Sequence, residues 1–320
     1  MIKILNKIGD NSLYFFYHDI SYQDIYNKLG SKPCIRIRKI FDMDIEYNCT
    51  ETCIRIITGG RFGNHFYSFC NALFAAKTSG LKTIYVTKGF LLLPKSFVYD
   101  DIFIKVKEKK FFRKTKINCF SHKFFAIGFR NLNSSDYKRL GSELRQDFAT
   151  MFINSLPHVV IPNNSLVVHF RSGDIFNDGW VSRFYGQPPC NYYLDAIRSR
   201  NWSKVILVSE DRKNPCVNVV EKVTGEYKQR SFEEDLAIML NAENFVISKG
   251  TLCKAIITIS RKIRNVFAFH DARINKVNTF VCFATNTYAE VVLKKWFNNQ
   301  IQREMILNSS CVRWEFFPKV

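Results

Sequence analysis

The stretch SLVVHFRSGDIF (165–176) joins an apolar run to a cluster of charged and turn-forming residues. An arginine guanidinium can hold a phosphate through two parallel hydrogen bonds, and it does not lose its charge. Arg171 is therefore suited to stabilising a departing diphosphate. His169 would point into the same crevice, Gly173 would allow close approach to the backbone, and Asp174 would orient Arg171 or cap the turn. The spacing leaves a salt-bridged surface turn as an open alternative.

A second candidate is the glycine-rich stretch GGRFGNH (59–65). Glycines let backbone N–H groups approach an anion, and the positive end of a following helix adds to the attraction. The stretch is neither the dinucleotide fingerprint GxGxxG nor a Walker loop, because GK[ST] is missing. Phosphate binding is therefore one interpretation of this stretch. The alternative is a tight turn in which Asn64 caps the helix.

These candidate residues need a sheet to position them, and the first such unit begins at 53. CIRIITGG (53–60) is typical of a strand that ends in a turn. The apolar spacing of the following twenty residues predicts a helix that ends at Gly80, and 81–86 predicts the next strand. Together they predict one βαβ unit with a glycine-rich first turn.

The second half of the chain alternates strands and helices for about a hundred residues, which predicts a doubly wound parallel sheet. Helix 231–240 is expected to open with a capping box of Ser231 and Glu234, and the tail from 285 is expected to be helical. The expected strands are 166–170, 204–211, 244–248 and, as the last one, 265–269, and the expected helices are 192–200, 214–225, 231–240 and 251–260.

The chain of 320 residues is long enough for two domains. We predict an α/β protein with two facing Rossmann-like domains. The expected boundaries are 1–155 for the first domain, 156–285 for the second and 286–320 for a helix and tail. Ligands of such sheets bind outside the carboxyl ends of the strands, where both candidate turns lie. A cleft lined by both would suit a diphosphate.

The formal net charge of +19 predicts attraction to polyanions, anionic lipid or phosphorylated ligands. One concentration of basic residues, 104–116, is either a solvated face or a peripheral contact with an anionic surface. A nucleic-acid-binding protein is a second class that the charge suggests. Because lysine and arginine show no interleaving with aromatic residues like that of RNA-binding motifs, we expect no specific nucleic-acid partner.

The ten cysteines include no CxxC pair, and several lie in apolar runs, so we expect them to be mostly reduced. The amino terminus lacks a continuous apolar region with a small-residue cleavage site, and no run approaches the length of a membrane span. We therefore expect a soluble cytoplasmic protein. Five N-x-[ST] sequons occur, at Asn48, Asn133, Asn163, Asn201 and Asn308, and they carry no information without secretion.

Four segments, in order, resemble motifs of the alpha-1,2-fucosyltransferases of glycosyltransferase family 11. GGRFGNHFYSFCNALFAAKTSG (59–80) resembles G-G-x-L-G-N-Q-[ML]-F-Q-Y-A-x-A-x-A, and HFRSGD resembles H-x-R-R-G-D, which protein O-fucosyltransferases and alpha-1,6-fucosyltransferases share more loosely. VILVSED (205–211) is similar to a strand that ends in F-S-D-D. EEDLAIMLNAENFVISKGTLCKAI (233–256) is similar to D-[LF]-x-[LI]-M-S-x-C-x-x-x-I-x-S-N-S-[ST]-F-S-W-W.

The resemblance implies an inverting, metal-independent GT-B enzyme of glycan biosynthesis or protein glycosylation, with GDP-fucose as donor and a glycan or glycoconjugate as acceptor. It needs no cofactor. The resemblance also implies a GT-B-like fold, in which 1–155 is the acceptor-side domain and 156–285 is the nucleotide-sugar domain. By motif position, Arg171 holds the donor β-phosphate beside Gly60, Gly63 and Asn64, and His169 contacts the nucleotide. The resemblance further places Ser248 and Thr251 near phosphate, and Glu210 and Asp211 near the nucleoside.

The chain also departs from these motifs. Ser172 replaces the second arginine, His65 replaces the glutamine, Gly250 replaces a serine, and Lys254 and Ala255 stand near the place of the Trp-Trp pair. The diphosphate site is retained, whereas the donor sugar is left open. A different 6-deoxyhexose, another nucleotide-sugar, or a non-catalytic nucleotide- or glycan-binding module remain alternatives.

The base that would activate the acceptor is not assigned. Asp174 and Asp178 are the nearby carboxylates, and Asp174 is better suited to orienting Arg171. Asp42 and Asp44 form a DxD pattern like that of metal-dependent transferases of another fold, but they precede the first βαβ unit, so we expect no metal there.

Overall fold

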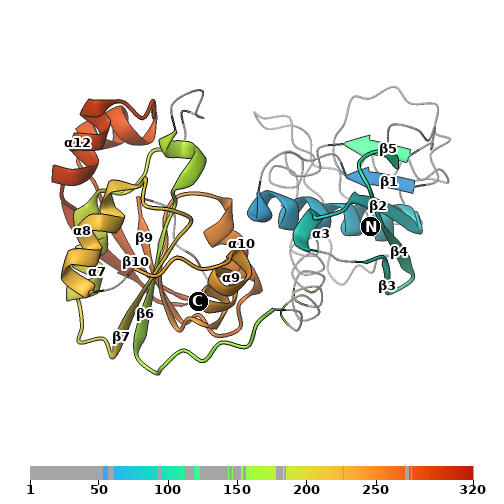
Figure 1. Ribbon diagram of the computed structural model, residues 1–320, viewed down its shortest axis with the longest axis horizontal. Coiled ribbons are helices and arrows are strands. Elements are labelled where there is room, and N and C mark those ends of the chain that lie inside the picture. The colour runs from blue at the N-terminus through green and yellow to red at the C-terminus, as the bar shows by residue number, and fades with distance from the viewer. Residues whose placement is uncertain are drawn as a thin grey trace, which may run out of the picture. The chain divides into compact units, whose positions relative to one another are not determined.

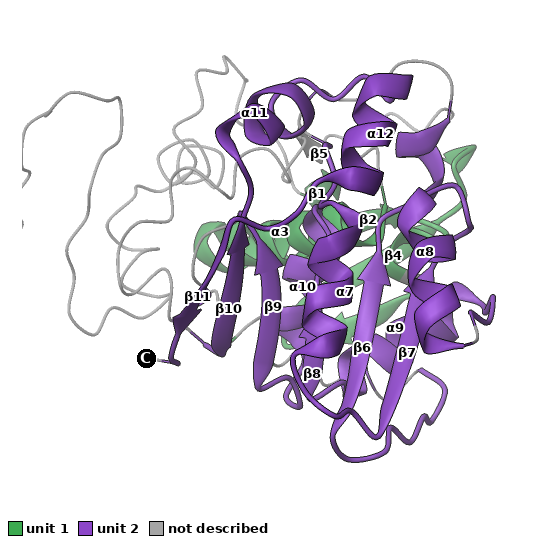
Figure 2. Cartoon of the chain, turned by 90° about the vertical axis from the view of Figure 1, so that its left-hand side faces the viewer, with its two compact units in different colours: residues 1–148 green, residues 149–320 purple. Residues whose placement is uncertain are grey.

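The chain folds into two compact units, residues 1–148 and 149–320 (Figures 1 and 2). The computed structural model describes residues 53–56, 61–92, 95–111, 119–122, 156–177, 185–225, 227–270 and 276–319, with single residues at 143, 146, 153, 183 and 274. Each unit contains a mostly parallel sheet, against which α3 packs in unit 1 and several helices pack in unit 2, so the chain is an α/β protein as predicted.

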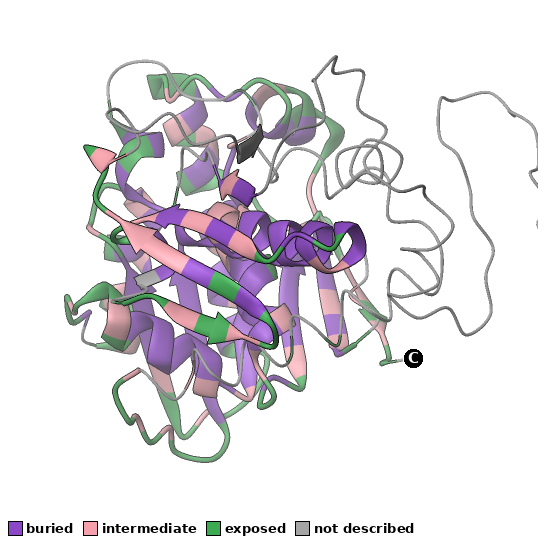
Figure 3. Ribbon diagram, turned by 90° about the vertical axis from the view of Figure 1, so that its right-hand side faces the viewer, coloured by how far each residue is buried: buried purple, intermediate pink, exposed green. Residues whose placement is uncertain are grey.

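Unit 1 contains a five-stranded sheet in the order β3-β4-β2-β1-β5. Its strands are β1 (Cys53–Ile56), β2 (Thr83–Thr87), β3 (Phe97–Tyr99), β4 (Ile102–Lys107) and β5 (Cys119–His122), and only β3 is antiparallel to its neighbour. The helix α3 (Phe62–Ser79) connects β1 to β2, and a short 3-10 turn follows at Phe90–Leu92. Figure 3 shows α3 as an almost fully buried helix. This is the predicted βαβ unit.

Unit 2 contains a six-stranded sheet in the order β11-β10-β9-β8-β6-β7, of which β11 alone is antiparallel. The strands are β6 (Ser165–Phe170), β7 (Lys204–Ser209), β8 (Asn244–Val246), β9 (Asn265–Phe269), β10 (Asn278–Phe283) and β11 (Arg313–Phe317). The helices are α7 (Cys190–Arg198), α8 (Pro215–Thr224), α9 (Phe232–Asn241), α10 (Thr251–Ile259), α11 (Asn286–Tyr288) with a π turn at Ala289–Leu293, and α12 (Gln300–Asn308). In Figure 1, α7 and α8 cover one face of this sheet and α9 and α10 cover the other.

The helix ends follow the expected local rules. Gly80 ends α3 with a φ of 79°, a left-handed conformation that costs glycine little, and its N–H donates to the carbonyl of Ala76. Ser231 and Glu234 form the predicted capping box of α9. Pro215 opens α8, whose N-cap Asn214 accepts a hydrogen bond from the N–H of Cys216.

The carboxyl-terminal segment extends the sheet further than the sequence predicts. The prediction that 265–269 is the last strand is wrong, because β10 pairs with β9 and β11 pairs with β10. Residues after 285 are partly helical, as expected. The strand that follows those helices returns to the sheet, so this segment is part of unit 2.

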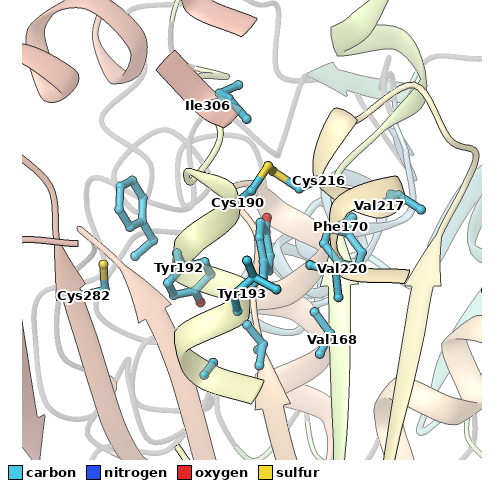
Figure 4. Close-up of a cluster of buried hydrophobic side chains, with 14 of the residues drawn as sticks. Val168, Phe170, Cys190, Tyr192, Tyr193, Cys216, Val217, Val220, Cys282 and Ile306 are labelled. Atoms are coloured by element: carbon cyan, nitrogen blue, oxygen red, sulfur yellow. A yellow bond between two sulfur atoms is a disulfide. The ribbon is translucent and has the colours of Figure 1, made fainter. Parts of the chain in front are cut away.

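The prediction of mostly reduced cysteines is also wrong. Disulfides join Cys190 to Cys216 and Cys282 to Cys311, and Cys53 is disulfide-bonded as well. Figure 4 shows the first of these bonds at the top of the core that α7 forms with β6 and α8. It ties the first residue of α7 to the first turn of α8. In the described part of the chain, no helix combines the length and apolarity that spanning a membrane requires.

Candidate functional site

The candidate residues of unit 2 meet at one edge of its sheet. Because β6 runs parallel to β7 and to β8, the residues that follow these strands emerge together at their carboxyl ends. The chain leaves β6 for β7 on one side and returns to β8 on the other, so this edge is the topological switch point where ligands of such sheets bind. The loops concerned are 171–174, 210–211 and 247–251.

Arg171 lies directly after β6 and is held from several sides. Its Nη2 donates to Oδ1 of Asp174 over 2.5 Å, and its Nη1 lies 4.0 Å from Oε2 of Glu210. The guanidinium also lies over the ring of Tyr185, 5.9 Å from its centre. Its side chain is only 14% exposed, whereas that of Asp174 is 54% exposed. These contacts fix a cation at the edge of the sheet.

One carboxylate oxygen of Asp174 thus accepts a hydrogen bond from Arg171, and this bond orients the guanidinium. This contact favours a positioning role over that of a general base.

Asp211 organises the backbone of the arginine turn. Its Oδ1 accepts hydrogen bonds from the hydroxyl of Ser172, from the N–H of Gly173 over 3.3 Å and from the N–H of Lys213 over 3.0 Å. Burial acts to raise the pKa of Asp211, but these hydrogen bonds outweigh it and hold the pKa below its usual value. The carboxylate of Asp211 therefore fixes the backbone of the turn. From the sequence alone, this structural role could not be distinguished from the expected contact with a nucleoside.

Gly173 is required at its position for two reasons. Its φ of +70° is left-handed, and a Cβ built there would lie 2.2 Å from Oε2 of Glu210. Glu210 thus packs directly over the turn, between Gly173 and the guanidinium of Arg171.

His169 lies near the end of β6 and is buried with two neighbours from the other side of the switch point. Its Nδ1 lies 2.7 Å from Oγ of Ser248 and 3.2 Å from Sγ of Cys253. Burial, with a smaller contribution from the charge of Arg171, lowers the pKa of His169 to about 3. The imidazole is therefore neutral at physiological pH and serves as a hydrogen-bonding group.

The start of α10 lies beside this cluster. Gly250 occupies the N-cap with a φ of 138°, and no side chain caps the helix, whose first residue is Thr251. The N–H groups of a first helical turn attract anions. Ser248 lies just after β8, and Thr251 begins α10.

Two further residues near this edge carry chemistry that sequence reasoning missed. Cys253 is a buried thiol outside the disulfides and contacts His169. Tyr193 on α7 has a buried hydroxyl without a hydrogen-bond partner among the described residues, and burial, together with the nearby Cys253, raises its pKa well above the usual value. In the sequence, the adjacent residues Tyr192 and Tyr193 are the signal that could have pointed to this hydroxyl.

The candidates of unit 1 are described by themselves. Gly63 is the buried second residue of α3, and Asn64 is the third. Arg61, and not Asn64, is the N-cap, so the alternative in which Asn64 caps the helix is wrong. Gly60, Asp42, Asp44 and Asp178 lie outside the described residues. Burial lowers the pKa of His65, whose ring stacks on Phe90 at 4.6 Å.

The basic stretch of unit 1 includes β4, where Lys105 lies over the ring of Tyr85 and Lys107 over that of Phe111. Two lysines of this stretch thus lie over aromatic rings. In the described ranges, no three His, Cys, Asp or Glu side chains are grouped so that they could hold a metal ion.

No family model matches this chain, and no curated protein matches it. Among solved structures, it is similar to one described as "E. coli heptosyltransferase WaaC with ADP", with 13% sequence identity over 79% of this chain and 96% of that chain. The TM-score is 0.37.

Proposed function

We propose that this chain is a glycosyltransferase that binds a nucleoside-diphosphate sugar at the carboxyl edge of the unit 2 sheet. The observation that carries the proposal is the placement of Arg171 at the switch point, oriented by Asp174 and close to the neutral His169. The four motif resemblances support the same assignment. The donor that they favour is GDP-fucose, or the GDP derivative of a related 6-deoxyhexose, and the acceptor is a glycan hydroxyl.

In the proposed reaction, the bond between the anomeric carbon and the diphosphate oxygen breaks, and the diphosphate leaves with the electron pair. The acceptor oxygen bonds to the opposite face of that carbon, which inverts its configuration, and its proton passes to a base. Negative charge grows on the diphosphate, so fixed positive groups accelerate the step. Arg171 supplies a full charge, and the start of α10 supplies partial charge.

The neutral state of His169 fits this scheme. A buried neutral imidazole hydrogen-bonded to Ser248 orders the edge between β6 and β8. We propose that its ring contacts the nucleotide and that Ser248 and Thr251 approach a phosphate, as the motif positions imply. We further propose that no divalent metal is required.

Arg171→Lys tests the central residue, because an ammonium cannot reproduce the two-pronged hydrogen bonding of a guanidinium. The loss of one such contact costs about 2.7–4 kcal/mol of barrier, or roughly 100- to 1000-fold in rate. The matched control is Arg200→Lys, since Arg200 stacks on Trp202 and Phe280 away from this edge. Equal transfer rates in the two variants would discredit the role of Arg171.

A donor screen separates the alternatives. The chain is incubated with GDP-fucose, GDP-mannose and dTDP-rhamnose, released nucleotide is measured, and thermal shifts are recorded with GDP, UDP and CMP. An enzyme turns over one donor, whereas a non-catalytic module gains about 2.7 kcal/mol at a hundredfold excess over Kd without turnover. Loss of activity with EDTA would overturn the metal-independent mechanism, and stability unaffected by every nucleotide would overturn the proposal.

A further inference from the structure

The disulfides of unit 2 indicate the kind of compartment in which the chain folds, and this bears on which surface asparagines are modified. Cys190–Cys216 joins two helices, and Cys282–Cys311 joins β10 to the residues just before β11. Such bonds form in oxidising compartments and are rare in the cytosol. A chain that folds in an oxidising secretory compartment also meets the machinery that modifies the asparagine of N-x-[ST] sequons. The sequons therefore become informative.

Three of the five sequons lie on described residues, and their asparagines share one property. Each asparagine is exposed, although the sheet and helices beside it are well packed: Asn163, Asn201 and Asn308. None of these asparagines is followed by proline. A glycan on any of them would project into solvent without disturbing the core.

Asn163 and Asn201 precede β6 and β7 and lie at the amino edge of these strands, opposite the candidate site. Their two loops are bonded to each other. Ser203 donates through Oγ to the carbonyl of Asn163 over 2.5 Å, and Asn164 donates through Nδ2 to the carbonyl of Asn201 over 2.9 Å. These bonds use backbone carbonyls, so they leave the side-chain amides of the two sequon asparagines available for modification. Glycans here would leave the carboxyl edge of the sheet uncovered.

Asn308 is the last residue of α12 and is exposed, as is Ser310, the hydroxyl residue of its sequon. The loop that follows is held by Asn191, whose Nδ2 donates to the carbonyl of Ser309 over 3.0 Å. The side chain of Asn308 is thus exposed like those of Asn163 and Asn201.

We propose that this chain carries N-linked glycans at Asn163, Asn201 and Asn308. In the reaction, the side-chain amide nitrogen loses one proton and bonds to the anomeric carbon of an oligosaccharide. The bond from that carbon to a lipid diphosphate breaks, and the lipid diphosphate leaves. The donor is a lipid-diphosphate oligosaccharide, and the catalyst is the compartment's own transferase. The proposal is independent of the function proposed above.

The test begins with the full chain isolated from its own cells with thiols blocked during lysis. Peptide:N-glycosidase in heavy-oxygen water converts each glycosylated asparagine to a labelled aspartate, which peptide mass spectrometry locates. Label at the three asparagines supports the proposal. An unlabelled asparagine at a position removes that position, and three unlabelled asparagines with the disulfides intact overturn the proposal.

Variants then assign the sites in a secreting host. Asn163→Gln, Asn201→Gln and Asn308→Gln are each expected to remove one glycosidase-sensitive step in electrophoretic mobility. Asn286→Gln is the matched control, because Asn286 is exposed but stands outside any sequon. Ser203→Thr preserves the sequon of Asn201 and is expected to keep its step. The same mobility in Asn201→Gln and Asn286→Gln would contradict the assignment at Asn201.

Discussion

Replacing Gly173 with alanine should destabilise unit 2 through a contact that one second substitution can remove. A Cβ at this position would lie 2.2 Å from Oε2 and 2.7 Å from Cδ of Glu210. The backbone there is also left-handed, with a φ of +70°. The alanine therefore carries a conformational cost and a steric cost, and only the steric cost depends on Glu210.

The two costs can be estimated separately. A side chain in a left-handed conformation costs roughly 1–2 kcal/mol. The Glu210 side chain is 49% exposed, so it can swing aside, and an off-rotamer side chain costs about 0.5–1.5 kcal/mol. The sum for Gly173→Ala is about 1.5–3.5 kcal/mol, and in a Glu210→Ala background it should fall to about 1–2 kcal/mol. The expected coupling between the two positions is thus about 0.5–1.5 kcal/mol.

The assay is urea unfolding followed by tryptophan fluorescence. All four tryptophans, at 180, 202, 296 and 314, belong to unit 2, so the signal reports that unit alone. The double-mutant cycle compares wild type, the two single variants and the double variant. A parallel cycle with Gly225→Ala is the control, since Gly225 also has a positive φ, but a Cβ added there would meet nothing within 4 Å.

The reasoning fails if the coupling between Gly173→Ala and Glu210→Ala is indistinguishable from that of the Gly225 cycle. Independent sites add within about 0.3–0.5 kcal/mol, which sets the smallest coupling that counts. A coupling within that range would mean that Glu210 does not lie over the turn. It would also contradict the position of Glu210 beside Arg171.

Three further predictions concern unit 2. The pKa of His169 is about 3 in the folded state and near 6.5 in the unfolded state, so the unfolded state binds the proton first as the pH drops. The stability of unit 2 should therefore fall as pH drops from 6.5 towards 3. His169→Asn should flatten this slope in urea titrations, and an unchanged slope would contradict the burial argument. Ser231→Ala should cost about 1 kcal/mol through loss of the capping box, whereas a cost near zero would show that the cap is not formed in solution. Replacing Cys190 and Cys216 together with serine should cost about 3–4 kcal/mol for a loop of 26 residues, and unchanged stability with intact thiols in the wild type would show that the bond does not form.

Much of the sheet scaffold could be predicted because its signals are local. The strand 265–269 matches β9 residue for residue, and the capping box of α9 and the glycine after α3 follow from short-range hydrogen bonding. Arg171, His169 and Ser248 could be brought together because parallel strands present their carboxyl ends at one edge.

The rest depends on long-range contacts that a linear reading does not show. β11 has an exposed, irregular pattern and gains its place only by pairing with β10. The disulfides join cysteines 26 and 29 residues apart, and one of these cysteines, Cys282, lies in an apolar run typical of a buried thiol. The roles of Asp211 and Glu210 were indistinguishable as neighbouring carboxylates, yet one bonds the turn and the other packs over Gly173.

The strand β11 has a practical consequence for handling the protein. It stands at the end of the sheet order, and it satisfies the outer main-chain groups of β10. A deletion of 313–317 would leave β10 as an open template on which a strand from another molecule could dock. Shortened versions of this chain should therefore precipitate on concentration while retaining their helices, and a purification handle is best appended beyond Phe317 with this ribbon kept intact.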